Sequence, residues 1–75
     1  MSEIIRQTFI EGYLVSTVLP LDTRGLYETM VFKTNTDNEV IVWSAIYSDH
    51  YETKQEAKEN HNETVVMYEN LENNI

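Results

Sequence analysis

The chain has 75 residues, with 13 acidic and five basic side chains, a net charge of −8 and no cysteine. This length predicts one domain, and the lack of cysteine excludes disulfides and thiolate metal sites. The negative charge argues against direct binding to nucleic acid or to an anionic membrane, and it favours a protein partner with a basic surface. No stretch has the pattern of a signal peptide or of a membrane span, so we expect a cytoplasmic protein.

The first half of the chain predicts β-strands. Residues 1–12 mix apolar and polar side chains and either add an extra strand or form an arm that packs on a partner. Residues 13–19 are rich in β-branched and aromatic side chains, which are typical of a strand, and Pro20 either ends this strand or places it at the edge of the sheet. Residues 26–34 alternate in the same way and predict the next strand.

A third strong strand signal follows a polar turn. Residues 35–39, NTDNE, predict a hairpin loop, since Asn and Asp tolerate left-handed backbone. Residues 40–47, VIVWSAIY, then predict a strand with two apolar faces. Such a strand is either central in its sheet or covered on its second face by another chain.

The hydrophobic period changes after residue 52. Thr53 and Glu56 form a capping box that opens a helix at Lys54, and residues 72–75 are expected to fray. The apolar stripe follows helical spacing through Ala57, His61, Thr64, Val65, Tyr68 and Leu71. We therefore predict a single α+β domain over residues 1–75, with a three- or four-stranded antiparallel meander covered on one face by a single C-terminal helix (β-β-β-α).

His61 and Glu28 are the polar residues that this fold places near the core. If the Glu28 face of its strand meets the helix, Glu28 is buried and must be paired. We predict that it contacts His61, with Ser16 or Thr17 as an additional partner, and that the contact raises the pKa of the histidine. If the Thr29 and Val31 face meets the helix instead, Glu28 lies at the surface, where it can belong to an interface.

The sequence shows no pattern that predicts catalysis. There is no nucleophile elbow and no glycine-rich phosphate loop. His50 and His61 stand eleven residues apart, without the clustering that a metal site needs. We expect no metal, no cofactor and no enzyme activity.

Partner binding is the more informative hypothesis. We predict an acidic helix face, which is either an ordinary solvated face or a surface that imitates nucleic-acid charge, and it contains Glu52, Glu56, Glu59, Glu63 and Glu69. Glu56, Glu59 and Glu63 are the candidate contact residues. Trp43 and Tyr47 either fill the core or lie on the sheet face that the helix leaves uncovered. An open apolar sheet face also predicts a homodimer through the sheet.

Three segments resemble a group of small phage and prophage proteins of unknown function, whose pattern is roughly VSTVxxxD, ETMxF and YxTxxEAxxxH. They are VSTVLPLD at 15–22, LYETMVF at 26–32 and YETKQEAKENH at 51–61. The resemblance covers about residues 15–65 and brings no activity with it. It implies that one structural constellation contains Thr17, Glu28, Thr29, Ala57 and His61.

These observations predict a small acidic phage or mobile-element accessory protein, acting in the host cytoplasm. We expect it to bind and inhibit a bacterial host protein, such as a defence component, by nucleic-acid mimicry of the anti-CRISPR type. One alternative is a structural or morphogenetic phage protein that acts through self-assembly. Another is a small-ligand sponge, in which an oligomer interface encloses a nucleotide signal.

Overall fold

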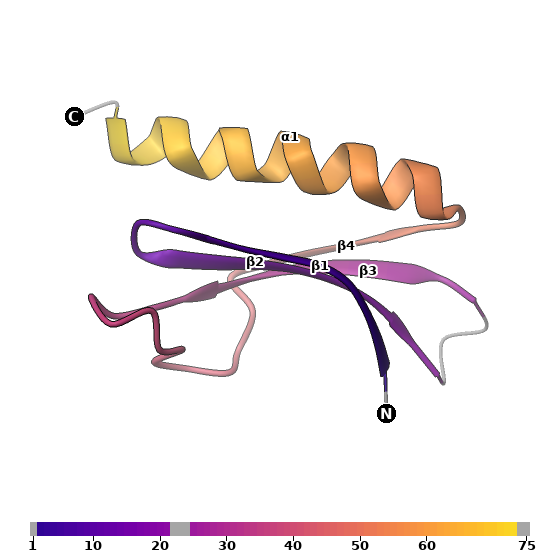
Figure 1. Ribbon diagram of the computed structural model, residues 1–75, viewed down its shortest axis with the longest axis horizontal. Coiled ribbons are helices and arrows are strands. Elements are labelled where there is room, and N and C mark those ends of the chain that lie inside the picture. Colours follow the sequence, from indigo (N-terminus) through magenta and orange to yellow (C-terminus); the bar gives the residue numbers. More distant parts are fainter. Residues whose placement is uncertain (1, 22–24, 74–75) are drawn as a thin grey trace.

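The computed structural model describes residues 2–21 and 25–73, which form four strands and one helix. The strands are β1 (Ser2–Ile10), β2 (Tyr13–Pro20), β3 (Tyr27–Lys33) and β4 (Tyr47–Tyr51), and the helix is α1 (Lys54–Asn73). The strands pair antiparallel in the order β1-β2-β3-β4, and α1 crosses one face of the sheet (Figure 1). The predicted α+β meander with a C-terminal helix is confirmed.

The N-terminal residues form a full strand of the sheet. β1 pairs with β2 through a tight turn at Glu11 and Gly12, where Gly12 has a φ of 85°. That left-handed backbone strongly favours glycine, because it has no Cβ to clash. The register shifts between Ile4 and Arg6, which bends the start of β1 away from the helix (Figure 1). Of the two expectations for residues 1–12, the strand is the one observed.

The strand predicted at residues 40–47 is wrong. Residues 41–46 form a loop, and the edge strand is Tyr47–Tyr51, which begins where the predicted strand was to end. Asn35 holds the preceding turn by accepting hydrogen bonds from the backbone amides of Asp37 (2.9 Å) and Glu39 (3.0 Å). The chain then makes one bridge, Thr34 to Val40, and leaves the sheet.

β4 is a strand despite its polar sequence, YSDHY, because it is the edge of the sheet. Its two tyrosines face the helix, opposite Val31 and Tyr27 of β3. Its Ser48 and His50 side chains lie on the other face and remain exposed. An edge strand needs only one partner strand and one apolar side, so its composition resembles that of a loop.

The core cluster that joins the two layers lies between the sheet and the helix, and Leu14, Val18 and Phe32 are buried on the other sheet face. Val15 and Val31 are fully buried and pack with Tyr68 of α1. The rings of Tyr13 and Tyr47 flank Tyr68, with centroids 4.9 Å and 6.5 Å from its ring. These three tyrosines come from β2, β4 and α1, so ring contacts connect both layers of this small domain.

The helix begins as predicted. The backbone amide of Glu56 donates to Oγ1 of Thr53 (3.1 Å), and that hydroxyl donates to Oε1 of Glu56 (3.0 Å). One otherwise unsatisfied amide of the first turn is thereby bonded. The helix continues to Asn73, and the rest of the tail expected to fray, residues 74–75, lies outside the described residues.

Candidate functional site

A buried cluster of hydroxyls and one imidazole connects the helix to three strands. Nδ1 of His61 lies 2.7 Å from Oγ1 of Thr17, and Nε2 lies 2.8 Å from Oγ1 of Thr8. Oγ1 of Thr17 is also 2.7 Å from Oγ1 of Thr29. His61, Thr17 and Thr29 are fully buried. Both ring nitrogens have a partner, and either neutral tautomer satisfies the chain of hydrogen bonds.

The environment of this histidine favours its neutral form. Burial, with a smaller contribution from the positive charge of Arg6, lowers the pKa of His61 from 6.5 to about 4. Arg6 itself donates to Oδ1 of Asn62, the next residue of the helix (2.9 Å). His61 is therefore uncharged at neutral pH and has a structural role between helix and sheet.

The predicted contact between Glu28 and His61 is wrong. The face of β3 that meets the helix carries Thr29 and Val31, so Glu28 points to the other side of the sheet. There its Oε2 lies 3.2 Å from Nε2 of His50. The predicted rise in the pKa of His61 is wrong for the same reason, because no carboxylate replaces the water that burial removes.

The two long sides of the helix differ in charge. Successive helical residues turn by about 100°, so Glu56 and Glu63 fall toward the side of α1 that faces β4, while Glu59, between them in the sequence, lies on the back of the helix, where it accepts a hydrogen bond from Gln55 (3.2 Å). The contact between Arg6 and Asn62 identifies the other side as the one facing β1. That second side carries Lys54, Lys58 and Glu69. We call the three exposed and adjoining glutamates Glu56, Glu59 and Glu63 the acidic flank, and no described lysine of the helix lies among them. Glu69, which the sequence predicted on the same face, lies on the β1 side instead.

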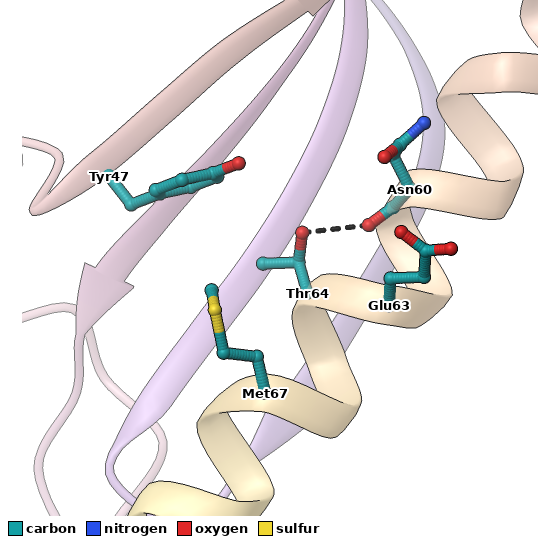
Figure 2. A pocket seen from close by; sticks show the side chains of 5 residues that line it. All are labelled: Tyr47, Asn60, Glu63, Thr64 and Met67. Carbon is teal, nitrogen blue, oxygen red and sulfur yellow. Dashed lines mark hydrogen bonds between the residues drawn. The ribbon is translucent and has the colours of Figure 1, made fainter.

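A shallow pocket lies between the acidic flank and β4. It has a volume of about 120 Å³ and is lined by Tyr47, Asn60, Glu63, Thr64 and Met67. The ring of Tyr47 extends from β4 toward the helix, opposite the Glu63 carboxylate and the Met67 thioether (Figure 2). Oγ1 of Thr64 donates to the carbonyl oxygen of Asn60 (2.7 Å), which fixes the floor of the pocket.

The pocket has the chemistry to hold a cationic side chain. An aromatic face attracts a cation, and a carboxylate accepts charge-assisted hydrogen bonds. Asp49 of β4 adds another exposed carboxylate along the same edge of the sheet. Burial and the neighbouring Tyr47 hydroxyl raise the pKa of Tyr51, so this tyrosine stays protonated and able to donate.

Trp43 and Tyr47 do not share the surface that the sequence predicted for them. Tyr47 is half-buried on the helix side of the sheet, in contact with the core. Trp43 is 74% exposed in the loop before β4, on the other side of the sheet. Its ring contacts that of Phe32 edge-on, with centroids 5.3 Å apart. The predicted partner residues therefore divide into two surfaces, Tyr47 with the acidic flank and Trp43 apart from them.

Two further observations concern site chemistry. Among the described residues, no group of three or more His, Cys, Asp or Glu side chains is arranged to hold a metal ion. No helix in the described part of the chain is both long and apolar enough to cross a membrane.

Comparisons with protein-family models, with curated proteins and with solved structures find no match to this chain. Its function must therefore be argued from its own surfaces.

The sequence did not point to Thr8 or to Met67. Thr8 belongs to the histidine cluster only because the register of β1 on β2 brings it opposite Val15, beside Thr17. Met67 lines the pocket because it lies one turn beyond Glu63 on the same side of the helix. The i to i+4 spacing from Glu59 through Glu63 to Met67 was the available signal.

Proposed function

We propose that this chain acts by binding a protein that presents a basic surface, and that it contacts this protein with the acidic flank, Tyr47 and the adjoining pocket. The separation of charge across the helix carries the proposal. Glu56, Glu59 and Glu63 adjoin one another on the back of the helix and its β4 side, while Lys54 and Lys58 lie on the side facing β1. Solubility requires charged side chains, but it does not require that acids and lysines lie on different sides of the helix.

The partner we propose is a bacterial host protein whose basic surface normally binds nucleic acid. Glutamates one helical turn apart present repeated negative charges about 5–6 Å from one another, and such a row can occupy a channel that binds phosphates. Together with the resemblance to phage proteins, this favours an inhibitor of a host nuclease or another defence component, as in anti-CRISPR proteins. Inhibition would be steric and would need no chemistry from this chain.

A defined basic probe tests the surface. The tetrapeptide of four arginines, titrated into isotopically labelled protein in low salt, should shift the amide signals of β4 and of the β4 side of α1. The double substitution Glu59→Lys and Glu63→Lys should weaken binding at least roughly tenfold, because two attractive charges become repulsive.

The matched control changes the net charge equally at a distance from the pocket. Glu11→Lys with Glu69→Lys reverses one charge in the turn between β1 and β2 and one charge on the side of α1 that faces β1. This variant should bind the probe within about twofold of the unchanged protein at 150 mM salt, where distant charges are screened. Equal loss in both double variants would show that only net charge matters, and the proposed surface would be rejected.

The mimicry proposal needs a second measurement. Immobilised protein is mixed with bacterial lysate, captured proteins are identified, and double-stranded DNA is added as competitor. A captured nucleic-acid-binding protein that DNA displaces, and that the Glu59→Lys, Glu63→Lys variant does not capture, supports an inhibitor of this kind. Capture that DNA leaves unchanged contradicts mimicry.

Self-assembly is the second candidate function. It is favoured by the exposed apolar side chains of the loop that contains Trp43, which the acidic flank does not involve.

A further inference from the structure

The loop before β4 has the composition of a buried strand but the exposure of a surface loop. Residues 40–46, VIVWSAI, contain four large apolar side chains that are between 50% and 74% exposed. They are Ile41, Val42, Trp43 and Ile46. Strand-forming side chains left in water at such density are a common mark of an interaction surface.

This loop lies on the side of the sheet that the helix does not cover (Figure 1). Trp43 packs on Phe32, and Phe32 lies opposite Leu14, which in turn lies opposite Phe9 of β1. Leu14 and Phe32 are buried, and the apolar surface around them consists of exposed side chains of the loop and of Phe9. We call it the outer patch, and its exposed members are Phe9, Ile41, Val42, Trp43 and Ile46.

The outer patch is nearly free of charge in a chain whose net charge is −8. Residues 40–48 contain no charged side chain. On the same face, β2, β3 and β4 present one acid and one histidine, Glu28 and His50, and these lie within 3.2 Å of each other. A basic protein is attracted to the acidic flank and finds no counter-charge on this patch.

We propose that the outer patch binds a second copy of this chain, so that the loops before β4 of the two copies pack against each other with the helices on the outside. Two copies repel each other wherever carboxylates meet, and the outer patch is the surface on which they can approach without this cost. The interface would be isologous, with Trp43 of each copy near its centre.

The available area is adequate for such a dimer. Multiplying the exposed fraction of each outer-patch residue by the full area of that residue type gives roughly 600 Å² of exposed surface per copy. A standard interface buries about 800 Å² per partner, and backbone next to the patch contributes the remainder. A tryptophan at the centre of the patch is also a side chain that is enriched at the centre of protein interfaces.

The test compares two lysine substitutions of equal charge and similar exposure. Val42→Lys lies in the outer patch, whereas Val66→Lys lies on the back of the helix, where the valine is 54% exposed. Sedimentation equilibrium over about 1–300 μM protein should give a dimer for the unchanged chain and for Val66→Lys. Val42→Lys should weaken the dimer by about 100-fold, since it brings two lysines, one from each copy, into an apolar interface.

Salt and a third variant separate this proposal from the proposed function. The dimer should persist or tighten at 1 M salt, because screening reduces repulsion between the copies. Glu59→Lys with Glu63→Lys should leave the dimer intact, although it weakens binding of the basic probe. A monomer at every concentration overturns the second-copy proposal, and so does a dimer that Val66→Lys disrupts and Val42→Lys does not.

Discussion

Acidification from pH 7 to pH 4 should destabilise this protein through a single imidazole. The pKa of His61 is about 4 in the folded protein and 6.5 when exposed. The unfolded chain therefore binds a proton as the pH falls below about 6.5, while the folded chain stays neutral at this site until about pH 4. The stability contributed by His61 is fully present above pH 6.5 and is lost progressively between these two values.

The size of the effect follows from the shift. At about 1.4 kcal/mol per pKa unit, the full difference corresponds to roughly 3 kcal/mol of unfolding free energy. We expect about 2 kcal/mol, because Arg6 and Asn62 beside the ring are exposed and water screens part of the interaction. Small domains have only about 5 kcal/mol or somewhat more in total, so such a loss should be easy to measure.

Urea unfolding between pH 4 and pH 7.5 measures the effect. The carboxylates also titrate in this range, and their protonation relieves repulsion, so the unchanged protein alone is ambiguous. His61→Gln keeps a donor and an acceptor but does not titrate. The difference in unfolding free energy between the two proteins should shrink by about 2 kcal/mol as the pH falls from 7 to 4. A pH-independent difference would refute the reasoning.

A spectroscopic control avoids reliance on the variant's stability. In the His50→Gln protein the only remaining imidazole is His61. Its ring carbon signal in the folded protein should stay in the neutral position throughout the range from pH 7.5 to 5. A titration midpoint near 6.5 would show that the ring is hydrated and that the cluster with Thr8 and Thr17 is not closed.

Two further substitutions test the packing of the two layers. Tyr68→Ala removes the ring that contacts Tyr13 and Tyr47, and it should lower the unfolding free energy by about 3–5 kcal/mol. Chemical denaturation of the variant measures this loss. A loss below about 1 kcal/mol would mean that the tyrosine cluster is not the core. Thr53→Ala removes the helix cap and should cost about 1 kcal/mol by the same assay, while Thr53→Ser, which keeps the hydroxyl, should cost much less.

The elements that the sequence predicted correctly are those whose signals are local. β2 and β3 alternate in a β-branched pattern, and the helix begins at a capping box whose hydrogen bonds depend on residues three apart. His61 was placed correctly on the inner stripe by helical spacing alone. Each of these signals needs no knowledge of the rest of the chain.

The failures concern pairing, which is not local. Residues 40–46 have strand composition, yet a strand forms only where another strand offers hydrogen bonds, and β3 is occupied by Tyr47–Tyr51 instead. The face of β3 that meets the helix was also undetermined, because alternation gives two faces without saying which is inside. The pairs Val15 with Val31 and Thr17 with Thr29 match in register, and this match was the available signal for the inner face.

The same physical cause explains why two surfaces with opposite chemistry coexist in so small a protein. The helix covers one sheet face, and on the other face Leu14, Val18 and Phe32 are buried while the ring of Trp43, which contacts Phe32, stays exposed. The helix in turn exposes its outward sides, and there the acidic flank lies beside Tyr47 while Trp43 lies on the far side of the sheet. If both proposals hold, a dimer displays two acidic flanks on its outside, and binding to a partner with two basic sites is strengthened by effective concentration. Salt then weakens capture of the partner while it leaves the dimer intact, which makes ionic strength the variable that distinguishes the two surfaces.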